Sequence, residues 1–322
     1  MNYSVAGCDH PDVMFAQLHK FCQNSSERYK ANLQHLLSAQ NPSQYNTRRL
    51  ATGLSKQTIF SSLRHSLGVP NIFVMDLMHL TALNDPDLLL GLWRGTVKCY
   101  QPDTKDSWDW KVLTGKIWES HGKTVAMATP YLPSSFCWVP RNPAEKINSG
   151  YKAWESLIYL FGLGPALLRS ILPEKYWQNF CKLTRGIQVM YQLKLSPEQI
   201  KEGNHLLCEF HEEFEDLYVQ RRAERIHFLH HGIHLLTHIG PETIHAGPLG
   251  CYAQWTMETA IGNLGDEIHQ DKDPYANIVQ CGLLHAQINS ILSIMPNVLL
   301  SEDELTKVPW GGKDLGNGYA LL

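Results

Sequence analysis

The 322-residue sequence lacks several features, and each absence excludes a class of protein. Its eight cysteines are scattered without a Cys-x-x-Cys pair, so we expect reduced thiols inside a cell rather than a zinc ribbon. No run of about 18 apolar residues is present, so no membrane-spanning helix is predicted. The Met1–Ser4 segment begins with neither a basic nor an apolar leader, so no signal peptide is expected.

Excess positive charge is also lacking. The formal net charge is -3 and the pI is about 6.6, whereas a freestanding nucleic-acid binder is usually basic. Strong DNA binding by the chain would therefore need a local basic patch or a further basic domain. Hydrophobic residues make up 43% of the chain, with 9 Trp, 13 Tyr and 10 Phe, which predicts a sizeable core and little disorder.

The apolar periodicity predicts a mainly helical chain with a few short strands early in the sequence. Ser196 followed by Pro197 is a clear helix start, with Ser as the N-cap and Pro at the first position. The apolar run 72–75 is compatible with a short buried strand. Helical spacing of apolar residues predicts helices over 29–37, 77–94, 148–172 (broken near 162–165), 206–218, 228–239 (ended by Gly240-Pro241), 252–268 and 278–295.

Asp76 is the first candidate site residue, because it directly follows that apolar run. Carboxylates at strand ends hold the metals of two-metal nucleases. His79 lies three residues on and would share a helical face with Asp76. The alternative is structural, since Asp is a preferred N-cap residue at the start of a helix.

Histidines crowd the 227–238 segment. His234 and His238 stand at i and i+4, a spacing that can bind zinc, but the sequence offers no third ligand. The structural alternative, which we favour, is a half-buried helix with imidazoles as polar partners. The acidic residues of 209–216 are interpreted as the solvated face of an amphipathic helix.

Two groups of motifs lie far apart in the chain. The first consists of Asp76-Leu77-Met78-His79 and Leu92-Trp93-Arg94-Gly95-Thr96; the second consists of His234-Leu235-Leu236-Thr237-His238, Gly247-Pro248, Tyr252-Ala253-Gln254-Trp255, and Glu258 four residues before Gly262. In this order they resemble the C-terminal half of CACTA-type (En/Spm-like) transposases of mushroom-forming fungi, as does the 7–13 stretch. Trp255 and Glu258 are three residues apart, where plant members have five.

This resemblance implies an RNase H-like core in which three carboxylates hold Mg²⁺ ions for DNA cleavage and strand transfer. Glu258 matches the last carboxylate and metal ligand, whereas Asp76 and His79 match an accessory Asp-x-x-His motif. The first two catalytic Asp residues have no counterpart in the sequence, so the chain resembles a fragment that is catalytically incomplete by itself. The implied partner is transposon-end DNA, and the implied location is the nucleus.

The resemblance also implies a domain organisation. Residues 1–71 would be a mixed remnant of the transposase core, and 72–96 a strand and helix with the Asp-x-Met-His motif. Residues 97–250 would form a mostly helical insertion, and 251–322 the Glu-bearing helix with C-terminal helices. The alternative function is non-enzymatic: a helical interaction module, or a relic product, that associates with itself or with full-length transposase.

Overall fold

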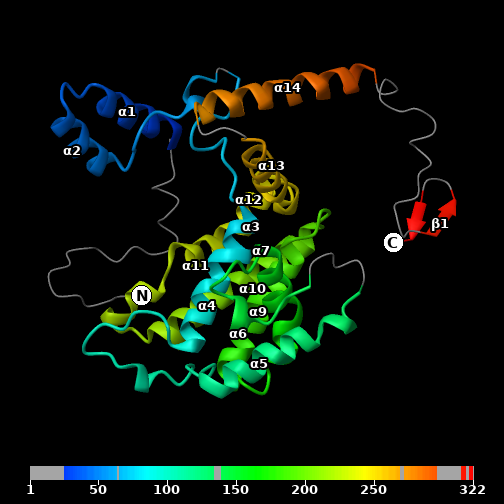
Figure 1. Ribbon diagram of the computed structural model, residues 1–322. Coiled ribbons are helices and arrows are strands. Elements are labelled where there is room, and N and C mark those ends of the chain that lie inside the picture. Colours follow the sequence, from blue (N-terminus) through cyan, green and yellow to red (C-terminus); the bar gives the residue numbers. More distant parts are fainter. Residues whose placement is uncertain are drawn as a thin grey trace. The chain divides into compact units, whose positions relative to one another are not determined.

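The computed structural model describes residues 25–63, 65–133, 139–268 and 272–295, and the backbone of 313–316 and 319–321. The chain divides into two compact units, Met1–Gln254 and Trp255–Leu322. Helices dominate both (Figure 1), which confirms the prediction of a mainly helical chain. The 7–13 stretch lies outside the described residues.

Two long helices, α9 (Glu174–Met190) and α10 (Pro197–Phe214), form the centre of the first unit and lie side by side in Figure 1. The α10 start is as predicted: Ser196 and Gln199 cap each other's backbone N–H groups. A Cβ atom on Gly203 would lie 2.6 Å from Met190 Sδ, so glycine allows the close approach of the two helices.

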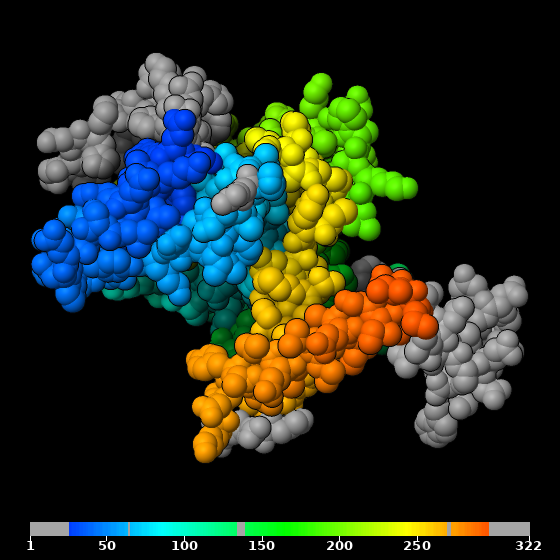
Figure 2. All heavy atoms as spheres, turned by 90° about the horizontal axis from the view of Figure 1, so that it is seen from above, coloured from blue at the N-terminus to red at the C-terminus, as the bar shows by residue number. Residues whose placement is uncertain are grey.

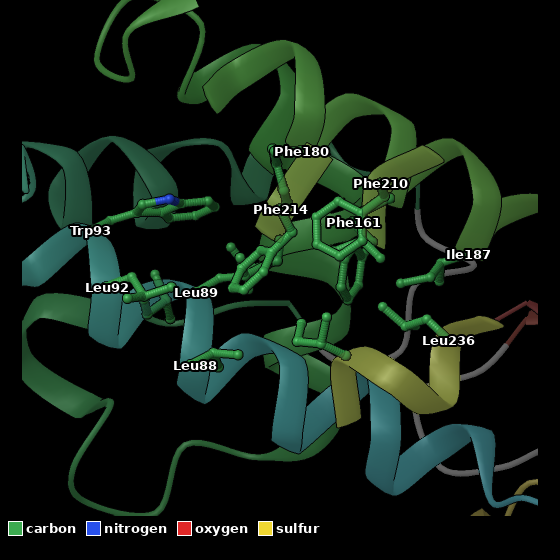
Figure 3. Close-up of a cluster of buried hydrophobic side chains, with 14 of the residues drawn as sticks. Leu88, Leu89, Leu92, Trp93, Phe161, Phe180, Ile187, Phe210, Phe214 and Leu236 are labelled. Atoms are coloured by element: carbon green, nitrogen blue, oxygen red, sulfur yellow. The ribbon is translucent and has the colours of Figure 1, made fainter. Parts of the chain in front are cut away.

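The Asp76 motif begins a continuous helical run that packs into this centre. It comprises α3 (Leu77–His79), a π-helical segment η3 (Leu80–Asn84) and α4 (Asp85–Arg94), in agreement with the predicted helix 77–94. Figure 3 shows Leu88, Leu89 and Trp93 among the aromatic side chains of the core. The core therefore holds this run in place by burial of apolar surface.

Shorter helices and turns complete the first unit. Its other α-helices are α1 (Ser25–Leu37), α2 (Pro42–Thr52), α5 (Gly115–Met127), α6 (Pro143–Lys146), α7 (Ala153–Leu157), α8 (Gly164–Leu167), α11 (His231–Leu235) and α12 (Ile239–Ala246). Two further π-helical segments are η6 (Ile158–Leu163) and η7 (Glu215–Val219). Turns of 3-10 helix are η2 (Ile59–Ser62), η4 (Lys105–Ser107), η5 (Thr129–Tyr131), η8 (Ala223–Phe228), η9 (Leu236–His238) and η10 (Leu249–Cys251).

The predicted strand at 72–75 is wrong. These residues form an irregular segment in which Phe73 is exposed, and no strand of the described residues pairs with them. A four-residue apolar run cannot by itself distinguish a strand from the approach to a helix. Among the described residues the only strands are β1 (Lys313–Gly316) and β2 (Tyr319–Leu321), an antiparallel pair late in the chain rather than early.

The predicted helix end at Gly240-Pro241 is also wrong, because both residues lie in the first turn of α12. Proline suits that position, since the N–H group it lacks would have no partner within the helix. A Cβ atom on Gly240 would lie 2.3 Å from Asn204 Oδ1, so glycine serves the packing of α12 against α10.

A buried ion pair fixes the loop that follows α4. Arg225 and Asp103 are 0% and 2% exposed, and Arg225 donates from Nε and Nη2 to the two carboxylate oxygens, each at 2.7 Å. Trp108 Nε1 donates to the same carboxylate at 2.8 Å. Residues 122 positions apart are thereby joined.

The second unit contains α13 (Trp255–Asp266), α14 (Pro274–Ile294) and the β1–β2 pair. Neither helix contains a buried residue. Within the described ranges, none of the helices combines the length and apolar character needed to cross a bilayer.

Candidate functional site

Asp76 starts α3 as its N-cap residue. Its backbone is extended, and its carboxylate accepts hydrogen bonds from the backbone N–H groups of Met78 (3.2 Å) and His79 (3.0 Å). These donors have no partner inside a helix, so the capping bonds stabilise the first turn. The structural alternative considered for Asp76 is therefore present.

The same carboxylate also joins the two motif regions. Asp76 Oδ1 accepts a hydrogen bond of 2.9 Å from the backbone N–H of Gln254, 178 residues later in the sequence. Gln254 directly precedes Trp255, the first residue of the Glu258-bearing helix α13. Sequence reasoning could not reveal this contact, because a backbone donor leaves no residue-type signature.

Asp76 has little capacity for a further ligand. A carboxylate offers about four acceptor positions. Oδ1 uses two, for Met78 and Gln254, and Oδ2 uses two, for the N–H and the ring Nδ1 of His79. Burial raises the pKa of Asp76, but the hydrogen bonds from Gln254 and His79 outweigh it and hold the pKa below its usual value.

His79 is oriented by this carboxylate. An ionised carboxylate can only accept, so Nδ1 of His79 carries a proton and donates it to Asp76 Oδ2. In neutral His79, Nε2 is then the basic nitrogen. A carboxylate that sets the tautomer and direction of an imidazole in this way is a common arrangement behind catalytic and metal-binding histidines.

Tyr191, which directly follows α9, holds the start of the motif helix in place. Its hydroxyl lies 3.0 Å from Thr81 Oγ1 and 3.3 Å from the Leu77 carbonyl. Burial raises the pKa of Tyr191 to about 12, so the phenol remains a neutral hydrogen-bonding group. The helix that begins at Asp76 is thus fixed at its cap and on its buried side.

The second part of the first motif group, 92–96, ends α4. Trp93 is fully buried and donates to Tyr218 Oη at 2.9 Å, and Gly95 has the positive φ of 67° that favours glycine at a helix end. Arg94 lies over the Trp118 ring at 4.8 Å. Arg94 and Thr96 also line a cavity of about 350 Å³.

Glu258 lies in the first turn of α13, in the second unit, and its side chain is exposed. A carboxylate in that turn is favoured by the positive end of the helix dipole, whatever its function. No group of three or more His, Cys, Asp or Glu side chains suited to a metal ion occurs among the described residues. They therefore do not form the three-carboxylate cage that the family resemblance implies for Mg²⁺.

The histidine segment contains a close pair rather than a metal cage. His234 and His238 lie with their Nε2 atoms 3.0 Å apart, and the His211 ring of α10 is centred 6.2 Å from that of His234. Burial, and then the neighbouring imidazoles, lower the pKa of His234. Two neutral imidazoles at this distance can share one hydrogen bond.

The acidic residues of α10 do not simply face solvent. Glu209 and Glu213 both pair with Lys182 of α9, and Asn179 donates to Glu213 at 3.2 Å. These carboxylates therefore take part in packing α10 against α9, in addition to forming the polar side of an amphipathic helix.

Asp85 is an unusual residue that the sequence did not single out. It is 1% exposed, and within the described chain neither carboxylate oxygen has a hydrogen-bond partner. Burial raises its pKa well above the usual value. In the sequence it is indistinguishable from a solvated acid in the first turn of a helix.

Comparison of the chain with protein-family models, with curated proteins and with solved structures finds no match in any of the three.

Proposed function

We propose that the chain is part of a CACTA-type DNA transposase in which Asp76 and His79 are positioning residues for the segment that leads into Glu258. The observation that supports this proposal is the hydrogen bond from Gln254 N–H to the Asp76 carboxylate. It joins two motif regions that the family resemblance selected independently of any structure.

Positioning suits Asp76 better than metal ligation does. Its acceptor positions are occupied by four N–H donors, and a metal would have to displace at least one of them. Glu258 is the proposed catalytic carboxylate, acting in the nucleus on transposon-end DNA. The first two catalytic Asp residues of the resembled family have no counterpart in the sequence, and we therefore expect the 322-residue chain alone to leave DNA uncut.

The test begins by mapping the complete transcript and expressing the protein that it encodes. Cleavage of supercoiled plasmid is then measured with and without Mg²⁺ for the parent, for Glu258→Gln, and for Glu119→Gln as a matched exposed control. We expect Mg²⁺-dependent cleavage that Glu258→Gln reduces by at least about 100-fold and Glu119→Gln leaves unchanged.

Two results would count against the proposal in different ways. If the complete product shows no metal-dependent cleavage, or if Glu258→Gln cuts as fast as the parent, the transposase assignment is refuted. If the 322-residue chain itself cuts DNA and Glu258→Gln abolishes this, the transposase assignment survives but catalytic incompleteness is refuted.

A second candidate function is self-association through α14. This helix of 21 residues contains no Asp, Glu, Lys or Arg, and Val279, Leu283 and Ile294 are more than half exposed. Exposed apolar surface of this kind often marks a site of association with another protein surface. Light scattering tests this: we expect a dimer or larger species that Leu283→Glu converts to monomer, whereas a monomeric parent would rule it out.

A further inference from the structure

Positive charge is concentrated near the start of the described chain. Residues 25–75 contain six basic residues, Arg28, Lys30, Arg48, Arg49, Lys56 and Arg64, and one acidic residue, Glu27. The remaining sequence contains 22 Lys and Arg against 30 Asp and Glu. A basic segment is therefore attached to an acidic body, which the overall net charge of -3 conceals.

The helices α1 and α2 give this segment a defined shape. Four residues, 38–41, connect them, and Asn41 caps α2 by accepting a hydrogen bond from Gln44 N–H at 2.9 Å. Arg48 of α2 donates to the His35 carbonyl at 2.8 Å and so binds the C-terminal end of α1. Leu36 of α1 is fully buried, so the hairpin has a packed side as well as an exposed one.

The other basic side chains remain available. Arg28, Lys30, Arg49 and Lys56 are exposed, and within the described residues none of them forms a hydrogen bond or an ion pair. Elsewhere in the first unit some basic side chains, such as Lys182 and Arg185, pair with acidic ones, and exposed lysines such as Lys116 lie in a part of the sequence where acidic residues outnumber basic ones. The α1–α2 hairpin with Lys56, which we call the basic hairpin, thus has four exposed cations and one acidic residue, Glu27. Figure 2 draws this segment in blue, its colour by residue number.

We propose that the basic hairpin binds the phosphate backbone of duplex DNA. Lysine, arginine and polar side chains are the usual partners of phosphate oxygens, and α2 adds exposed Gln44, Asn46 and Thr47. Binding by four cations would release counterions, so log affinity would fall with log salt with a slope of about -3 to -4. The choice of DNA among polyanions rests on the proposed function, whereas the location of the surface rests on charge alone.

Charge also argues against a second copy of the same surface as the occupant. Two basic hairpins facing each other would repel, because the segment offers only Glu27 as a counter-charge. An anionic membrane is a different polyanion, and exposed Leu50 and Ile59 lie in the same segment. The experiment therefore includes vesicles as a separate arm.

Fluorescence anisotropy with a labelled 24-bp duplex of arbitrary sequence measures the affinity of the full chain between 50 and 200 mM salt. The test variant is Arg28→Gln/Lys30→Gln/Arg49→Gln/Lys56→Gln. We expect it to weaken binding at 50 mM salt by at least about tenfold and to reduce the salt slope by about 3. The double variant Arg28→Lys/Arg49→Lys, which keeps the charge, should bind within about threefold of the parent.

The matched control removes four exposed lysines of the acidic body: Lys116→Gln/Lys123→Gln/Lys194→Gln/Lys201→Gln. It changes net charge equally and should retain most of the affinity, while circular dichroism verifies that both quadruple variants fold. Equal losses in the two, or no loss in the test variant, would overturn the proposal. The proposal would also be overturned if binding to vesicles with 30% phosphatidylserine depended on the hairpin while DNA binding did not.

The outcome is separable from that of the proposed function. Hairpin-dependent DNA affinity without Glu258-dependent cleavage by the complete product would retain the binding surface and reject the transposase assignment. Cleavage that depends on Glu258, combined with unchanged DNA affinity of the hairpin variant, would reject the binding surface alone.

Discussion

Replacing Asp103 by Asn should be among the most destabilising conservative changes in the first unit. The Asp103 carboxylate accepts from Arg225 Nε and Nη2, from Trp108 Nε1 at 2.8 Å and from Ser107 Oγ at 3.1 Å. In asparagine an NH2 group replaces one carboxylate oxygen, so it would face the N–H or O–H donors that this oxygen accepts from. It would also leave the guanidinium of Arg225, which is 0% exposed, without a counter-charge.

The expected loss follows from that burial. Removing one partner of a buried ion pair costs about 3–5 kcal/mol, because the remaining charge stays out of water. Asp106→Asn in the same loop is the matched control, since its pair with Lys111 spans 3.7 Å and the Asp106 side chain is 99% exposed. An exposed pair of this kind contributes about 0–1 kcal/mol.

Urea unfolding followed by tryptophan fluorescence gives both values, because Trp108 contacts the pair directly. Burial raises the pKa of Asp103, but the bonds and charge of Arg225 outweigh it and hold the pKa well below its usual range. The stabilisation is therefore complete above the unfolded pKa of about 3.9 and decreases as the pH falls below it. A loss below about 1 kcal/mol at pH 7, or one equal to that of Asp106→Asn, would refute the reasoning.

Three further changes test other parts of the first unit. Burial lowers the pKa of His121 to about 4, so the free energy of unfolding decreases as the pH falls from about 6.5 to 4. Urea unfolding should show a decrease of about 2 kcal/mol between pH 7 and 5 in the parent and none of this decrease in His121→Gln. The same pH dependence in both proteins would disprove this. Burial raises the pKa of Asp85, so at pH 7 folding must neutralise a carboxylate that is ionised in the unfolded chain. Asp85→Asn should therefore increase the free energy of unfolding by more than about 1 kcal/mol at pH 7 and by less at pH 4. A variant that is less stable than the parent at pH 7 would contradict this. A Cβ atom on Gly122 would lie 2.7 Å from Ala144 Cβ, so Gly122→Ala should lower the melting temperature, with a cost in stability of about 1–3 kcal/mol. The control is Gly262→Ala on α13, where an added Cβ atom would meet no neighbour within 4 Å, and its effect should be neutral or stabilising. Similar changes in melting temperature for the two variants would contradict the packing explanation.

The sequence predicted those elements whose cause is local. Ser196 and Pro197 start α10 because a cap hydroxyl and a proline act within one turn of the helix. The run 72–75 is not a strand, and four apolar residues are too few to define a period. Gly240-Pro241 was assigned to a helix end, although the same pair serves a helix start once α12 packs against α10.

Contacts between distant residues were beyond sequence reasoning. Nothing near Asp103 indicates that its partner is Arg225, and Asp85 differs from an ordinary helix-start acid only in what surrounds it. The basic hairpin, by contrast, is visible in the sequence once charge is counted by segment, and the whole-chain value of -3 hides it. For a chain with several parts, the charge of each segment therefore says more about possible partners than the net charge of the whole chain does.

The candidate site shows how far residue type alone can specify a role. Aspartate at 76 was compatible both with a metal ligand and with a helix cap, because each needs the same carboxylate. In the structure, four N–H donors occupy the carboxylate, one of them from Gln254, and these hydrogen bonds favour the cap role. A metal at Asp76 would therefore loosen both the α3 cap and the Gln254 segment, so the bonds that make this residue a good anchor also make it a poor ligand.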